Sequence, residues 1–289
     1  MIEVKNLFKS YGNKGVLSDI NFSVVQGQSV AIVGKSGAGK SVLLKCLIGL
    51  VKPDEGTIYV DNKLINTMSF RQLQKIRSNI GMVFQFGALF DSMTVGENIS
   101  LALHKLTKLS DNEIQKRVFN SLKEVDMADT EDLMPSELSG GMKKRVGIAR
   151  AIATKPTYLF YDEPTTGLDP VMTDSINRLI LKFQSTGKVT SVIITHEMRT
   201  VYDVADRVLL LHDGKIWFDG AAINWSEVKI HVLSHGLHYA SCVFEGERVY
   251  DGEIFKLEEH TERLFYSASR MGFKIPYTPE LLNKACKEI

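Results

Sequence analysis

Hydrophobic residues along this chain follow two alternating patterns. Short apolar runs rich in β-branched residues, "SVAIVG" at 29–34, "YLFYDE" at 158–163 and "SVIITH" at 191–196, are each followed by a segment with a helical pattern. Strands that are apolar at nearly every position are buried on both faces, which is typical of parallel strands covered by helices. The pattern therefore predicts an α/β fold with a parallel sheet.

Two other regions have different patterns. Before Gly34, and again at 56–65, short strand-like runs alternate with polar turns, which predicts a small antiparallel sheet beside the main core. Residues 94–156 are mostly helical in pattern, with Ser110 at the start of one helix and Pro156 after the end of another. We expect this region to form a helical subdomain.

The chain is expected to contain one large domain, residues 1–220, and a mostly helical extension, residues 221–289, whose role is unknown. Apolar residues recur at helical spacing within 254–271, and Thr278 with Pro279 predicts the cap and first turn of another helix. A piece this short can hardly hold its own core, so we expect it to pack on the large domain or on a partner.

The charges are nearly balanced, with 35 Lys and Arg against 34 Asp and Glu. No overall field therefore draws the protein onto nucleic acid, and we expect no nucleic-acid partner. The three cysteines form no C-x-x-C pair, which favours a reducing compartment. The longest apolar runs fall short of the ~20 residues that cross a bilayer, and the start of the chain lacks the order of a signal peptide. If the protein acts at a membrane, another chain does the crossing.

The stretch "GKSGAGKS" at 34–41 fits the pattern G-x-x-x-x-G-K-[ST] between a predicted strand and a predicted helix. Its glycines let backbone N–H groups close around the β- and γ-phosphates of ATP, and the helix N-terminus adds partial positive charge. Lys40 is expected to neutralise phosphate oxygens, and the Ser41 hydroxyl to ligate Mg²⁺. The predicted nucleotide-binding residues here are Gly34, Lys35, Ser36, Gly37, Ala38, Gly39, Lys40, Ser41 and Val42.

Two acidic residues end the apolar run "YLFY". Asp162, at the strand tip, is expected to hold Mg²⁺ through its water shell. Glu163 points differently and could orient or deprotonate an attacking water. An acidic pair at a strand end often only begins a loop, but beside a phosphate-binding loop it predicts hydrolysis of ATP.

A second anion-binding helix start is predicted in "LSGGMKKRVGIARAI" at 138–152. Ser139 has the position of an N-cap, and Gly140 and Gly141 open the first turn, which leaves N–H groups for an anion. One ATP needs only one such cradle, and each motif occurs once. This predicts a homodimer in which each nucleotide lies between the phosphate loop of one chain and the "LSGG" of the other.

The ordered motifs "GKSGAGKS", "GMVFQ", "LSGGMKKR", "YLFYDEP", "TTGLDP" and "IITH" resemble the ATP-binding cassette subunits of ABC transporters over roughly residues 1–220. The resemblance implies a P-loop NTPase core. It also implies that Tyr11 stacks on adenine, that Gln85 senses Mg²⁺ and that Glu163 activates water. By the same resemblance, Asp169 lies in the loop that crosses the dimer, and His196 contacts the γ-phosphate. Two simpler interpretations stay open, because Tyr11 could cap a small core and His196 could be a strand-end histidine bonded to backbone.

The segment "FQFGALFDSMTV" at 84–95, with "LMPSELSGGMKKRVGIARAI", is similar to the ATPases of Mla-type phospholipid transport systems, a subgroup that includes plastid lipid importers. This resemblance implies an integral membrane permease and an MCE-domain lipid-binding protein as partners, at the cytoplasmic face of the inner (plasma) membrane. Four apolar side chains of the segment could receive a short helix of the permease or fill the helical subdomain: Phe86, Leu89, Phe90 and Met93.

Two alternatives to a lipid transporter remain. Neighbouring importer ATPases share much of the segment at 84–95, so an importer of a small polar nutrient is the main rival. A soluble ABC protein without a transport role is the other, although such proteins usually carry two cassettes or a long coiled-coil insertion, and this sequence has neither.

Overall fold

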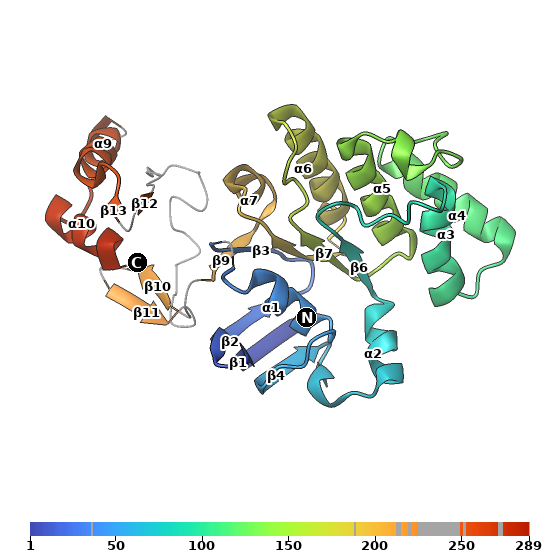
Figure 1. The fold of residues 1–289 in the computed structure, drawn as a ribbon, viewed down its shortest axis with the longest axis horizontal. Helices are drawn as coiled ribbons and strands as arrows, with labels where there is room; N and C mark the ends of the chain where they lie inside the picture. Colours follow the sequence, from blue (N-terminus) through green and yellow to red (C-terminus); the bar gives the residue numbers. More distant parts are fainter. Residues whose placement is uncertain are drawn as a thin grey trace. The chain divides into compact units, whose positions relative to one another are not determined.

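The computed structural model describes residues 1–35, 37–187, 189–211, 215–218, 221–224, 249–250, 253–270 and 274–288, of which 215–218, 221–224, 250 and 288 are described by their backbone alone. The chain divides into two compact units, Met1–Gly214 and Lys215–Ile289, and each is described by itself. Figure 1 shows the elements of both units along the chain.

A five-stranded parallel sheet forms the centre of the first unit, which confirms the predicted α/β class. Its strand order is β6-β7-β8-β3-β9, with bounds β6 Ile80–Val83, β7 Tyr158–Asp162, β8 Thr190–Ile194, β3 Ser29–Val33 and β9 Arg207–Leu210. Every residue of β3 and β8 is buried. This burial on both faces is what the uninterrupted apolar runs predict.

Helices cover both faces of this sheet (Figure 1). Their bounds are α1 Lys40–Leu47, α5 Gly140–Ala153, α6 Pro170–Gln184 and α7 Met198–Val204. A buried cluster joins α5 and α6 to β7 and β8 through residues such as Val146, Ile180 and Tyr161. On another side, Val201 of α7 packs against Ala31 and Val33 of β3.

The predicted antiparallel sheet is also present, with strand order β2-β1-β4-β5. Its bounds are β1 Ile2–Tyr11, β2 Lys14–Val24, β4 Glu55–Val60 and β5 Lys63–Leu64. Ile2, Val4 and Ile58 are buried on its inner face. The short helix α2, Phe70–Arg77, follows this sheet and is capped by Ser69.

The region 94–156 is helical, as its pattern predicts. α3 spans Val95–Leu106 and α4 spans Asp111–Glu124, ahead of α5. At the start of α4, the Glu113 carboxylate accepts hydrogen bonds from the backbone N–H and the hydroxyl of Ser110, at 2.8 and 2.7 Å. The three helices share one apolar cluster with β7, so this region is packed directly on the parallel sheet.

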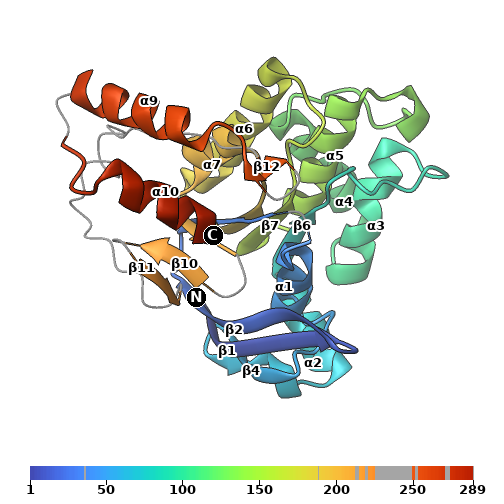
Figure 2. The ribbon, with the colours of Figure 1, turned by 60° about the vertical axis from the view of Figure 1, so that its left-hand side comes forward.

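The second unit contains two strand pairs and two helices in its described part. Their bounds are β10 Lys215–Phe218, β11 Ala221–Asn224, β12 Val249–Tyr250, β13 Glu253–Ile254, α9 Leu257–Arg270 and α10 Pro279–Glu288. The Thr278 hydroxyl accepts from the N–H of Leu281 at 3.3 Å, which confirms the predicted cap. Thr261 of α9 bonds Asn283 of α10, and Figure 2 shows these helices side by side.

Across all the described residues of both units, no helix combines the length and the apolar character that a bilayer crossing requires.

Candidate nucleotide-binding and hydrolytic site

The phosphate loop and the two acidic residues leave the parallel sheet at one edge. Asp162 at the end of β7 pairs in register with Ile194 of β8, and Ile194 pairs with Ile32 of β3. The residues that follow these three strands therefore emerge together. The sheet thus brings Glu163, His196 and the loop beginning at Gly34 to its carboxyl edge, where ligands of open α/β sheets bind.

The phosphate loop has a backbone that only glycine adopts readily. Gly37 and Gly39 have φ angles of +79° and +99°, and a Cβ on Gly39 would lie 2.8 Å from the carbonyl oxygen of Val16. α1 begins directly after Gly39 without a side-chain cap. Its first backbone N–H groups are therefore available to bind an anion at the start of the helix. Ser36 lies outside the described residues.

Lys40 is held inside this loop rather than in solvent. Its side chain belongs to a residue only 8% exposed, and Nζ donates to the carbonyls of Gly34 and Lys35 at 2.6 and 3.0 Å. An ammonium carries three donors, so one N–H remains for a phosphate oxygen. The loop therefore positions a positive charge next to bare backbone donors.

The residues predicted to hold Mg²⁺ supply the oxygen donors that this ion prefers. Burial raises the pKa of the Asp162 carboxyl, and the neighbouring Glu163 carboxylate adds to the rise, while Lys45 and Lys40 oppose it. A partly buried carboxylate next to a second one suits a divalent cation. The Ser41 hydroxyl at the start of α1 is exposed, so these two side chains fit a Mg²⁺ ion that also binds nucleotide phosphates.

Gln85 reaches the same edge of the sheet from the neighbouring strand. Val83 of β6 pairs with Tyr161 of β7, so Gln85 and Glu163 each lie two residues beyond a matched pair. Gln85 is half-buried. Its position is consistent with the predicted link between the Mg²⁺ site and the segment that follows it.

Glu163 is oriented by three contacts, one to the last residue of β8 and two to residues that follow β7 and β8. Its N–H donates to the carbonyl of Ile194 at 2.8 Å, and the Thr166 hydroxyl donates to Oε2 at 2.8 Å. Nδ1 of His196 lies 2.9 Å from Oε2 and 3.0 Å from Oε1. Nδ1 of His196 is thus bonded to a carboxylate side chain rather than to backbone. A carboxylate held in this way can orient a water for attack.

The second anion-binding helix start has the predicted cap. The Ser139 hydroxyl accepts from the N–H of Met142 at 3.3 Å, and both Ser139 and Gly140 are exposed. Gly141 is buried, and a Cβ there would lie 2.0 Å from Cε of Met172. Lys144, five residues further along α5, contacts the backbone of Glu163, so one helix carries both the exposed Ser139 and a contact to the Glu163 turn.

Asp169 and Tyr11 also lie near the surface. The Asp169 carboxylate accepts from the N–H of Met172 at 2.9 Å and caps α6. Tyr11 ends β1 and is 52% exposed, so it does not cap a core. Nζ of Lys9 lies 5.4 Å from the centroid of its ring, and the exposed part of the ring is available for stacking.

Three side chains around the site have contacts that the sequence motifs did not predict. Thr166 binds the Glu163 carboxylate, as described above. Nζ of Lys144 donates to the carbonyls of Thr166 and Glu163 at 2.8 and 3.3 Å. Arg150 donates to the carbonyls of Ala88 and Gly87 at 2.7 and 2.6 Å. α5 therefore contacts both the Glu163 turn and the segment after Gln85.

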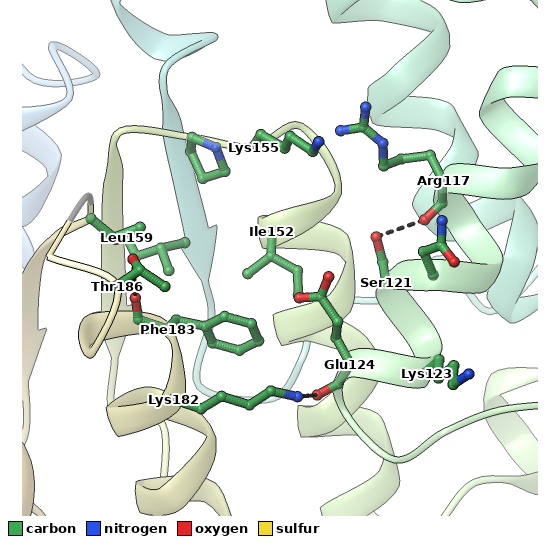
Figure 3. A pocket seen from close by; sticks show the side chains of 13 residues that line it. Arg117, Ser121, Lys123, Glu124, Ile152, Lys155, Leu159, Lys182, Phe183 and Thr186 are labelled. Carbon is green, nitrogen blue, oxygen red and sulfur yellow. Dashed lines mark hydrogen bonds between the residues drawn. The ribbon is translucent and has the colours of Figure 1, made fainter.

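A cavity of about 710 Å³ lies at the opposite end of β7 and is lined by residues that include Leu159, Ile152 and Phe183. Figure 3 shows Lys182 reaching across to Glu124 at this cavity; its Nζ donates to the Glu124 carbonyl at 2.7 Å. None of the residues predicted to bind the nucleotide or Mg²⁺, or to catalyse hydrolysis, lines it. This cavity joins the helical region to the sheet and is separate from the nucleotide site.

Comparison with protein families gives two matches. The family model described as ABC transporter matches residues 17–166. A second model, described as amino-transferase class IV, matches residues 242–289, a segment for which the motifs indicate no family.

Two curated relatives are similar to most of the chain. The protein TRIGALACTOSYLDIACYLGLYCEROL 3, chloroplastic, of Arabidopsis thaliana is 38% identical over 237 residues, which are 76% of this chain and 68% of that protein. The methionine import ATP-binding protein MetN 2 of Bacillus cereus is 43% identical over 224 residues, which are 76% of this chain and 66% of that protein. The chain thus spans about two thirds of the length of each.

Solved structures show the same fold. The dimeric ATP-binding cassette MJ0796, in a post-hydrolysis state with ADP and Pi, is 33% identical with a TM-score of 0.69, covering 78% of this chain and 99% of that one. The cbiO1 protein of Clostridium perfringens, part of the transporter complex cbiONQ, is 34% identical with a TM-score of 0.69, covering 78% of this chain and 89% of that one.

Proposed function

Because the chain belongs to the ABC transporter family of ATP-binding subunits, we propose that it is the motor of a transporter that moves phospholipid or another lipid between membranes. Membership of this family makes the protein an ATP-binding ATP hydrolase. The observation that carries the hydrolytic role is the Glu163 carboxylate, held by Thr166 and His196 at the sheet edge where the phosphate loop begins.

The hydrolytic mechanism follows from these positions. The backbone N–H groups of the phosphate loop and Lys40 bind the β- and γ-phosphates and stabilise the charge that develops on them. Glu163 orients the attacking water and takes up its proton, and His196 holds that carboxylate and contacts the γ-phosphate. Ser41 and Asp162, with Gln85 nearby, are the residues that would hold Mg²⁺, and the bound ion would neutralise phosphate charge. Tyr11 stacks on the adenine.

The active form in this proposal is a homodimer. The start of α5 at Ser139 is exposed, so a second chain can reach it. Two solved structures of the related cassette MJ0796 are dimeric. Each ATP then lies between the phosphate loop of one subunit and Ser139, Gly140 and Gly141 of the other, with Asp169 near the interface.

A membrane permease is the partner proposed for the segment after Gln85. Phe86 and Phe90 are 76% and 54% exposed, whereas Leu89 packs against the helical cluster. Of the four apolar residues of this segment, the two phenylalanines are therefore open to a permease helix, whereas Leu89 fills the helical subdomain. Met93 is half-buried. Exposed aromatic side chains suit a groove that receives a short helix. The cbiO1 relative is itself part of a transporter complex.

The lipid substrate is supported by the relative from Arabidopsis, which carries the name of a glycolipid, and by the sequence of the segment at 84–95. An MCE-domain lipid-binding protein is the further partner in this proposal. The methionine import relatives favour a second candidate, an importer of a small polar nutrient. Both candidates place the subunit at the cytoplasmic face of the inner membrane.

The domain assignment is part of the proposal. Residues 1–220 form the cassette, with residues 94–156 as its helical subdomain. The match to class IV amino-transferases covers only 242–289, which is less than a typical domain. The match therefore supports a relationship between the extension and that family, but we propose no activity for the extension.

Co-purification tests the choice between the two candidates. The tagged chain is isolated from detergent-solubilised membranes, and its companions are identified by mass spectrometry. A permease with an MCE-domain protein supports lipid transport, and a permease with a periplasmic methionine-binding protein contradicts it. ATPase activity of the isolated complex is then measured in nanodiscs with phospholipid, and separately with methionine and its binding protein.

A matched pair of variants tests the permease contact in the same experiment. Phe86→Asp is expected to lower recovery of the permease because it places a charge in the apolar contact. Phe70→Asp changes another exposed phenylalanine, 69% exposed on α2, and is expected to recover the permease like the unmodified chain. Equal recovery with both variants contradicts the assignment of this segment.

A further inference from the structure

Lys144 is a buried lysine whose partners are main-chain carbonyls. The residue is 5% exposed, and its Nζ donates to the carbonyls of Thr166 and Glu163 at 2.8 and 3.3 Å. Among the residues that the structure describes, no carboxylate lies within ion-pair distance of it. Burying an ammonium is costly unless its donors are satisfied, so these two carbonyls hold the side chain in one place.

The turn that Lys144 binds sets the position of the Glu163 carboxylate. Glu163 has a φ of +51°, a left-handed backbone that is unusual for a residue other than glycine. Its N–H is bonded to β8 through Ile194, and its carboxylate is bonded to the Thr166 hydroxyl. Lys144 fastens the carbonyls at both ends of this turn, those of Glu163 and Thr166, to one atom of α5.

The same helix holds two other parts of the site. Ser139 caps its start, and Arg150 near its end binds the carbonyls of Gly87 and Ala88. A helix of this length moves as a rigid element, because each residue is fixed by its neighbours. A shift of the Ser139 end is therefore transmitted to the Glu163 turn through Lys144.

We propose that Lys144 is a positioning residue for Glu163, and that it links the Glu163 carboxylate to the helix that presents Ser139. This inference rests on the proposed dimer for its second part. Ser139 of a subunit contacts the nucleotide bound by its partner, while Glu163 of that same subunit serves its own nucleotide. Lys144 therefore connects the two hydrolytic sites within each chain.

Substitution at Lys144 tests the positioning role. Lys144→Met keeps the length of the side chain and removes its N–H donors, and Lys144→Gln keeps an amide that can donate to one carbonyl. Lys143→Met is the matched control, because it makes the same chemical change one residue earlier, on a side chain that is half-buried. ATP turnover and thermal stability are measured for all four proteins.

Lys144→Met is expected to lower kcat about tenfold or more, since small misplacements of a reacting group are costly, with KM for ATP within about threefold because the phosphate loop is untouched. Lys144→Gln is expected to fall between Lys144→Met and the unmodified protein. The positioning role is contradicted if Lys144→Met lowers kcat no more than Lys143→Met, or if kcat and KM change by the same factor.

Mixed dimers test which site Lys144 serves. One subunit carries Glu163→Gln, so a single site remains active, and Lys144→Met is placed in either subunit. Turnover is expected to fall about tenfold when Lys144→Met shares a chain with the intact Glu163, and by less than about twofold when it lies in the other chain. Equal effects, or a larger effect from the other chain, overturn the proposal.

A separate measurement tests whether the proposed dimer forms. If Glu163→Gln alone forms no dimer with ATP in light scattering, the proposed assembly is wrong, and the comparison of Lys144→Met with Lys143→Met still decides the positioning role.

Discussion

Nδ1 of His196 lies 2.9 Å from a carboxylate oxygen of Glu163, across the carboxyl ends of β7 and β8. The Glu163 side chain is only 13% exposed, whereas that of His196 is 60% exposed. The carboxylate is thus fixed at the sheet, whereas most of the imidazole is open to solvent. In the proposed mechanism this pair divides two tasks: Glu163 acts on water, and His196 contacts the γ-phosphate.

Replacing Glu163 with Gln removes the proton acceptor and keeps the shape of the side chain. We expect Glu163→Gln to bind ATP and dimerise but to lose at least about a hundredfold in turnover, the usual contribution of a general base. Glu197→Gln, a nearby acid without a bond to the site among the described contacts, serves as the control. Steady-state hydrolysis that matches the control would show that another group activates the water.

Replacing Lys40 with Ala is expected to weaken ATP binding itself. Loss of a charge-assisted hydrogen bond costs about 1.5 to 3 kcal/mol, which corresponds to a roughly ten- to hundredfold higher Kd. Lys35→Ala, in the same loop but exposed, is the comparison and is expected to lose much less. Titration with a fluorescent ATP analogue measures both, and equal affinity of the two variants would contradict the role of Lys40.

The head-to-tail dimer predicts that two inactive chains restore each other. Lys40→Ala lacks the phosphate contact, and Ser139→Arg blocks the opposite cradle, so each homodimer is inactive. A mixed dimer contains one intact site, formed by the loop of one chain and Ser139 of the other. We expect an equimolar mixture to regain at most about a quarter of the unmodified activity. A mixture that stays as inactive as its components would rule out the shared site.

The helix caps could be predicted because local sequence determines them. The caps at Ser110, Ser139 and Thr278 follow from a side chain and an N–H two or three residues away. Lys144 and Arg150 are different, because they bind carbonyls on segments 19 to 63 residues distant. Every residue has a carbonyl, so these contacts leave no signal in the sequence. The division of the segment after Gln85, with Leu89 inside and Phe86 outside, depends on tertiary packing in the same way.

The buried ammonium of Lys144 gives the protein a stability that depends on pH in a defined direction. Burial lowers the pKa of Lys144 to about 8, against the opposing attraction of the Glu163 carboxylate, from an ordinary value of 10.5. Between pH 8 and pH 10.5, the folded state therefore binds fewer protons than the unfolded state. Stability therefore rises with pH across this window, and below pH 8 the full cost of burying the charge applies.

Comparison with Lys144→Met isolates this effect, because all other titrating groups are common to both proteins. We expect the melting temperature of the unmodified protein, relative to that of Lys144→Met, to increase from pH 8 towards pH 10.5, with each unit of pKa shift equivalent to about 1.4 kcal/mol. Lys143→Met is measured in parallel as the control for removing a lysine at the neighbouring position. A flat difference for Lys144→Met would mean that the Lys144 ammonium keeps its ordinary pKa, because solvent or an anionic group reaches it and offsets its burial beside the Glu163 turn.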